Sequence, residues 1–90
     1  MAYADGGLLP PEAGLNARSP SDEFFRLGQI YSSGLGVSVD YVAAHKWFNI
    51  AASRGCKESR LRRREMVDEL SSAELREAQR AAREWLRKAN

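Results

Sequence analysis

Two residue types that could bind a metal or act as a nucleophile occur once each in this chain, as His45 and Cys56. A zinc site needs several His, Cys or carboxylate ligands, and one residue of each type does not supply the usual sets. A lone cysteine excludes an internal disulfide and is typical of a reducing compartment. Arg54 and Lys57 lie close to Cys56 in the sequence, and cationic neighbours are typical of reactive cysteines, so an enzyme using this thiol stays open as an alternative. We expect structural roles for both residues and no metal, cofactor or small-molecule substrate.

The segment Arg60–Arg64 contains four arginines and is the strongest run of charge. Clustered arginines can contact phosphates, which leaves a small basic nucleic-acid-binding protein as the alternative function. On a helix these side chains spread over most of the circumference. Glu58 with Arg62, and Arg64 with Asp68, are spaced for i,i+4 ion pairs. No aromatic residue interleaves with the run, and the net charge is only +2, so we expect a solvated helix face rather than a nucleic-acid site.

Gly34 and Gly36 do not form a phosphate-binding loop, because no strand precedes them and no Gly-Lys-Ser/Thr follows. Two glycines at this spacing instead predict a turn with positive φ angles. Leu35, Val37 and Val39 are expected to point inward from this turn.

Two helices are predicted before residue 56. The first begins at a Ser19 cap and runs to about Ser33, where Gly34 stops it, and the second is capped by Asp40 and covers about 41–54. Apolar and small residues at i, i+3, i+4 and i+7 give each helix an inner face. These faces are Phe24, Leu27, Gly28 and Tyr31 in the first helix, and Ala44, Trp47, Phe48 and Ala51 in the second.

Two more helices are predicted after Gly55. The third covers about 57–70, and the fourth covers about 72–89 after a capping box formed by Ser71 and Glu74. The outer face of the fourth helix has Arg80, Glu84 and Lys88 spaced for i,i+4 pairs. The inner faces are Leu61, Met66, Val67 and Leu70 in the third helix, and Leu75, Ala78, Ala82, Trp85, Leu86 and Ala89 in the fourth.

The sequence repeats itself at an offset of 38 residues. Residues 43–48 (Ala-Ala-His-Lys-Trp-Phe) match residues 81–86 (Ala-Ala-Arg-Glu-Trp-Leu), and Ala51 matches Ala89. A period of this length holds one helical hairpin, the unit of an α-solenoid. We therefore predict an all-α fold of two antiparallel helical hairpins, in which Gly28 allows close contact with Ala44 or Ala51.

Residues 1–18 are rich in glycine and proline and are predicted to form an irregular arm, with one helical-repeat domain over 19–90. No helix is predicted before the first one, so its outer side, including Phe25 and Ile30, needs cover. The arm, a second copy of the chain or a partner protein could provide that cover.

The pattern of the first hairpin resembles a Sel-1-like repeat, a relative of the tetratricopeptide repeat. The resemblance covers 19–55, and 56–90 is similar to the capping helix pair that commonly follows a last repeat. It implies a protein-interaction scaffold without catalytic residues. The residues that carry it are Leu27, Gly28, Tyr31, Gly34, Gly36, Val37, Asp40, Ala44, Trp47, Ala51, Ala52 and Gly55, with Ala78, Ala82 and Trp85 in the second pair.

We therefore predict a non-enzymatic module that binds another protein or itself, with contacts at Phe25, Ile30, Arg60 and Arg63. No stretch is apolar enough to cross a membrane, and no signal sequence is evident, which predicts a cytoplasmic location. Eleven of the fourteen basic residues are arginine, which we interpret as a trace of a GC-rich, bacterial genome.

Overall fold

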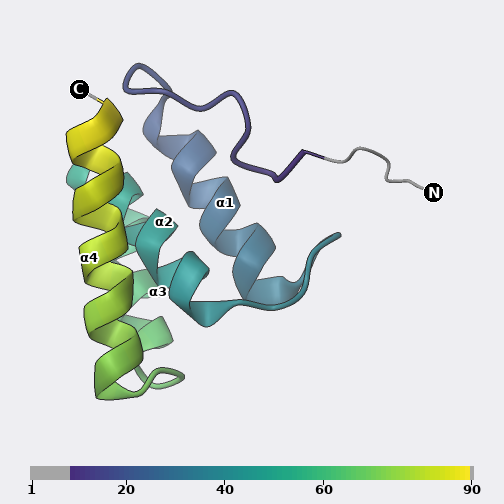
Figure 1. The fold of residues 1–90 in the computed structure, drawn as a ribbon, viewed down its shortest axis with the longest axis vertical. Helices are drawn as coiled ribbons and strands as arrows, with labels where there is room; N and C mark the ends of the chain where they lie inside the picture. The colour runs from purple at the N-terminus through teal and green to yellow at the C-terminus, as the bar shows by residue number, and fades with distance from the viewer. Residues whose placement is uncertain (1–8, 90) are drawn as a thin grey trace.

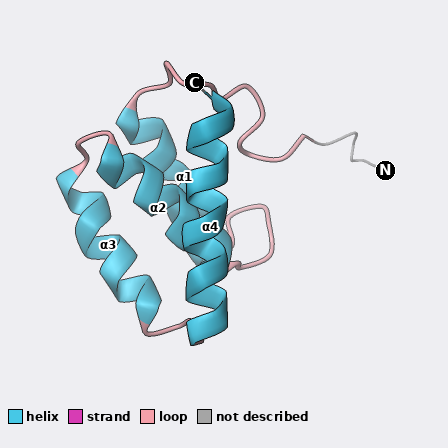
Figure 2. Cartoon of the chain, turned by 60° about the vertical axis from the view of Figure 1, so that its left-hand side comes forward, coloured by secondary structure: helices cyan, strands magenta, loops and turns pink. Residues whose placement is uncertain are grey.

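The structure is a computed structural model that describes residues 9–89, so the first eight residues of the predicted arm lie outside it. Four helices and no strand occur in this range, which confirms the all-α prediction (Figure 1). Helix α2 packs against each of the other three helices, and α3 lies at the edge of the molecule (Figure 2). The helices are α1 (Ser21–Ser33), α2 (Tyr41–Ser53), α3 (Lys57–Val67) and α4 (Ser72–Ala89).

The core is centred on three aromatic rings from three helices. The ring of Trp47 in α2 stacks on Phe24 of α1 at a centroid distance of 6.1 Å. Trp85 of α4 meets both rings edge-on, at 5.6 Å from Trp47 and 5.2 Å from Phe24. Ala78 and Ala82 are fully buried, and their small side chains let α4 approach α2 closely. Burial of Trp47 should contribute about 2–3 kcal/mol to folding.

Both predicted caps of the later helices are confirmed. The N–H of Ala43 donates to Asp40 Oδ1 at 3.0 Å, so Asp40 caps α2. Ser71 and Glu74 form the capping box, because the N–H of Glu74 donates to Ser71 Oγ and the N–H of Ser71 donates to Glu74 Oε1. These bonds satisfy backbone donors that have no partner within the helix.

The predicted Ser19 cap of α1 is wrong. The helix begins at Ser21, and Pro20 occupies the capping position without a side-chain hydrogen bond. Ser19 Oγ instead accepts from the N–H of Asn16 at 3.1 Å, so its hydroxyl serves the turn before the helix. Helix α3 ends at Val67 rather than near 70, because i→i+3 turn bonds replace the helical pattern there.

The loop after α1 differs from the prediction in the direction of its apolar side chains. Gly34 has φ 76° as expected, but Leu35 and Val39 are exposed and Val37 is only half-buried. The N–H groups of Gly34 and Leu35 both donate to the carbonyl of Ile30. The chain therefore leaves α1 in a tight turn, which the left-handed conformation of Gly34 allows.

The atoms nearest to a Cβ built at Gly28 belong to Phe48, and the contact with Ala44 or Ala51 stays a prediction. A Cβ atom at Gly28 would lie 2.4 Å from two ring atoms of Phe48. The Phe48 ring is buried and also lies 5.6 Å from the ring of Phe25. The glycine therefore makes room for an aromatic ring of α2.

The described part of the arm packs on α1 and the core. Leu15 contacts the core cluster, and the hydroxyl of Tyr31 donates to Glu12 Oε1 at 2.6 Å. The guanidinium of Arg54 donates to the carbonyl of Ala17. Burial, followed by the Glu12 carboxylate, raises the pKa of Tyr31 well above its usual range. The arm thus supplies part of the cover that the outer side of α1 needs.

Candidate functional site

Most residues of the repeat signature lie in the core, where they serve folding. The tryptophans and alanines of the signature bring α1, α2 and α4 together. Gly34 and Gly55 lie at helix ends, and Gly28 makes room for Phe48 within α1. The buried members are Leu27, Gly28, Ala44, Trp47, Ala51, Ala52, Ala78 and Ala82; Tyr31, Gly34, Val37 and Trp85 are half-buried; Gly36, Asp40 and Gly55 are exposed.

His45 is buried in α2, with only 2% of its surface exposed. Its Nδ1 atom has no hydrogen-bond partner within residues 9–89. Burial, and then the positive charge of Arg63, lower the pKa of His45 below its ordinary value. A buried imidazole with an unpaired nitrogen is unusual, because most buried polar groups are hydrogen-bonded.

Cys56 is half-buried and packs against the core cluster at the junction between α2 and α3. Within the described range, no group of three or more His, Cys, Asp or Glu side chains could hold a metal ion. The same range contains no helix long and apolar enough to cross a membrane.

Helix α3 is more open than predicted, because Ser59 is its only buried residue. The predicted inner face is wrong: Leu61 and Val67 are exposed, at 54% and 39%, while Met66 is half-buried. Among the described helices, α3 packs mainly on α2. Ser59 makes the buried contact of this helix, while Leu61 and Val67 stay at the surface.

The arginine run divides between two sides of α3. Arg62 pairs with Glu58 at 3.6 Å, as predicted, and with Glu65 at 3.5 Å. Arg60, Arg63 and Arg64 instead lie at i, i+3 and i+4, on one face of the helix. The predicted pair of Arg64 with Asp68 is wrong, because Arg64 turns to that face and makes no ion pair with a described residue.

A groove of about 390 Å³ runs between α3 and α4, and α2 forms its floor; we call it the α3/α4 groove. Arg63 is held in it by a hydrogen bond from its guanidinium to Asn49 Oδ1 at 2.6 Å. No acidic side chain lines it. The lining residues are His45, Asn49, Arg60, Arg63, Arg64, Val67, Leu75 and Gln79.

A second groove, of about 380 Å³, lies on the other side of α3 towards α1. Leu35, Phe48 and Met66 supply its apolar surface, and Arg62 stands at its edge with its two glutamate partners. Leu35 is 67% exposed, which is high for a large apolar side chain. Helix α3 therefore has a cationic groove on one side and a more apolar groove on the other.

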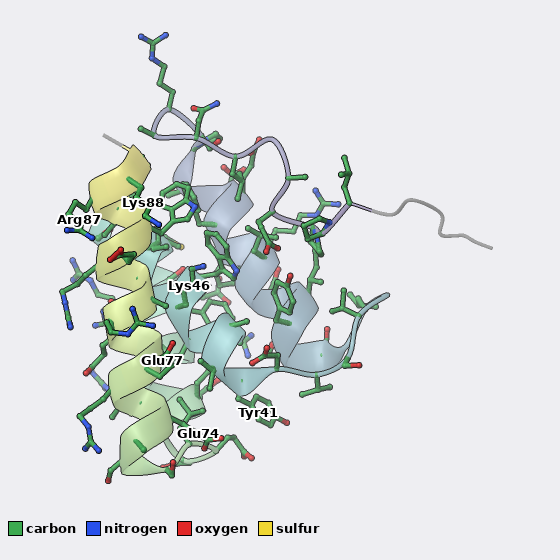
Figure 3. All side chains as sticks on the ribbon, viewed as in Figure 1. Tyr41, Lys46, Glu74, Glu77, Arg87 and Lys88 are labelled. Carbon is green, nitrogen blue, oxygen red and sulfur yellow. The ribbon has the colours of Figure 1, made fainter. Side chains whose placement is uncertain are left out.

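The charges of α4 follow its backbone dipole. Glu74 and Glu77 lie toward its beginning, and Arg87 and Lys88 lie in its last turn (Figure 3). Each sign stands at the end where the helix dipole favours it. Nearer the C-terminal end, Glu84 accepts from Arg87 at 2.5 Å and lies 4.0 Å from Lys88, which confirms the second predicted pair.

The predicted pair of Arg80 with Glu84 is wrong. Arg80 instead pairs with Glu77 at 2.7 Å, one position closer in the helix. The groups of this pair and of the Glu84 pairs lie at the surface, where solvent screens them. Glu77 and Glu84 of α4 therefore form ion pairs within their own helix and not with the arginines of the α3/α4 groove.

The four predicted contact residues do not come together. Phe25 and Ile30 are half-buried on α1, where Phe25 packs on Phe48 and Ile30 lines a cavity beside the arm. Arg60 and Arg63 lie together in the α3/α4 groove. Asn49 and Gln79 also line this groove, and the sequence did not predict a role for them. Both occupy ordinary polar positions on their helices.

A comparison with protein families finds the Sel1 repeat in two stretches, residues 25–56 and 75–90. No curated protein matches the chain, and no solved structure does. The first stretch covers most of α1, all of α2 and the loop between them, and the second covers most of α4. Helix α3 lies between the two matched stretches, which together span more than half of the sequence. This chain belongs to the Sel1 repeat family.

Proposed function

We propose that the chain is a non-enzymatic protein-interaction module that binds its partner through α3. Sel1 repeats generally mediate contacts between proteins. In our proposal one repeat over 19–55 and a C-terminal helix pair over 56–90 form a small scaffold. The single cysteine supports a reducing, cytoplasmic location, which we include in the proposal.

The observation that carries this proposal is the exposure of α3. One residue of this helix, Ser59, is buried, while Leu61 and Val67 present apolar surface to solvent. A groove lies on each side of the helix. A helix that has apolar side chains at its surface and a groove on each side offers shape and area to a partner.

The partner is another protein or a second copy of this chain. Sedimentation of the purified chain over a range of concentrations separates these two forms. A monomer at all concentrations assigns the α3 surface to a different protein. A dimer that Leu61→Ser with Val67→Ser disrupts assigns it to self-association.

The proposal is tested by quantitative affinity purification with matched variants. The test variant carries Leu61→Ser and Val67→Ser, and the control carries Leu9→Ser and Val39→Ser, which are also exposed but lie outside α3. We expect a protein that binds the wild type and the control but not the test variant, and that binds again when both components are purified. Equal capture by all three chains would contradict a contact through α3.

A further inference from the structure

The α3/α4 groove contains positive charge that no described side chain neutralises. Arg60, Arg63 and Arg64 line it, no acidic side chain does, and the ion pairs of the described residues involve other arginines. Three like charges on one helix face repel each other by Coulomb's law. An anion placed between them would remove this repulsion and gain three favourable interactions.

The groove also has features of a formed site. The guanidinium of Arg63 is oriented by Asn49 Oδ1 at 2.6 Å, which uses only part of its fork of five donors. His45 closes the floor as a buried ring whose Nδ1 has no partner among the described residues. An arginine fixed by a neighbour loses less side-chain freedom when it binds a ligand.

We propose that the α3/α4 groove binds the carboxylate of a glutamate or aspartate in an acidic segment of the partner protein. Arg63 is the central ligand, because its planar guanidinium can hold both oxygens of a carboxylate. Arg60 and Arg64 flank it and neutralise neighbouring acidic residues of the segment. This inference rests on the proposed function and names the chemistry of the partner.

A peptide fits this groove better than a nucleic acid does. Val67 and Leu75 add apolar walls that can contact the aliphatic stem of an acidic side chain. The lining contains no Phe, Tyr or Trp on which bases could stack. The next arginine of the run, Arg62, is paired with two glutamates on the other side of the helix, so it adds no unpaired charge to this groove.

The test measures binding of a fluorescent hexaglutamate peptide to the full chain at low and moderate salt. The groove variant carries Arg60→Gln and Arg64→Gln, and the control carries Arg18→Gln and Arg26→Gln, two exposed arginines of the arm and α1 outside this groove. Both variants lose the same net charge, and circular dichroism checks that both stay helical. We expect the groove variant to bind about 10-fold or more weakly and the control to stay within about 2-fold of the wild type.

Three outcomes would overturn the proposal. The first is no binding of hexaglutamate by the wild type at low salt. The second is an equal loss in both variants, which would mean that general charge attracts the peptide. The third is a single-stranded oligonucleotide of equal charge that binds more tightly and loses its affinity in the groove variant, which would assign the groove to nucleic acid.

A second readout comes from the only histidine of the chain. His45 lines the groove with the three arginines. A carboxylate bound there should raise its pKa towards the ordinary value, which NMR follows on one ring signal, whereas a peptide bound elsewhere should leave it unchanged. If a partner identified through Leu61 and Val67 binds the groove variant as well as the wild type, the proposed function stands and the acidic-segment inference is wrong.

Discussion

Replacement of Gly28 by alanine tests the contact between α1 and α2 most sharply, because helix propensity alone and the packing in the structure predict opposite signs. In an exposed helix interior, alanine stabilises by about 1 kcal/mol relative to glycine. In this structure the new Cβ would lie 2.4 Å from two atoms of the Phe48 ring and 2.7 Å from a third. Atoms do not approach so closely, so the ring or α1 must move.

The cost of that movement should exceed the helix gain. Phe48 is 1% exposed and lies against Phe25, so its ring has little space to move into. Overpacking of a core costs about 1–3 kcal/mol, and the short distances place this case at the upper end. After the helix gain of about 1 kcal/mol is subtracted, Gly28→Ala should lower the free energy of unfolding by about 2 kcal/mol.

The assay is thermal and urea unfolding followed by circular dichroism. A loss of about 2 kcal/mol should lower the Tm by about 8–16 °C in a domain of this size. In a Phe48→Leu background, the smaller side chain should remove most of the cost of Gly28→Ala. A Tm equal to or above that of the wild type would refute the reasoning, as would an equal cost in both backgrounds.

Three further changes test other parts of the fold. Asp40→Ala removes the cap of α2 and should cost about 1 kcal/mol in urea unfolding; an unchanged midpoint would show that the cap adds nothing. Trp47→Ala removes the central ring and should cost about 3–5 kcal/mol, near the total stability of a small domain, so helical signal should fall strongly at 37 °C. His45 has a lower pKa in the folded chain than its ordinary value of 6.5, so the unfolded state binds the proton more readily and stability should fall as the pH drops below about 6.5. His45→Leu should make this fall smaller, and an unchanged pH profile would argue against a buried, neutral ring.

Local signals in the sequence predicted the elements and the core well. Asp40, and Ser71 with Glu74, mark helix starts that the structure confirms, because a cap depends on residues within one turn. The spacing of Trp47 and Trp85 predicted buried faces that meet at the centre of the fold. These features depend on helical periodicity, which a sequence displays directly.

Features that depend on contacts between helices were predicted less well. The helical spacing of Leu61 and Val67 predicted that they belong to the inner face of α3. Both are exposed, because the other described helices leave the outer side of α3 uncovered. The side chain of Arg63 is held in the groove by a hydrogen bond to Asn49, which lies fourteen positions earlier on another helix. No spacing within α3 reveals such a neighbour, so the groove became visible only from the three-dimensional arrangement.

Site-specific photocross-linking in cells tests the central claim, contact through α3, most directly. A photoactivatable residue replaces Leu61, at the exposed centre of α3, and in a matched chain replaces Arg83, an exposed position of α4. We predict one discrete cross-linked product from the Leu61 position, containing a second protein or a second copy of this chain, and little product from the Arg83 position. Equal products from both positions, or product from the Arg83 position alone, would contradict an interaction surface on α3.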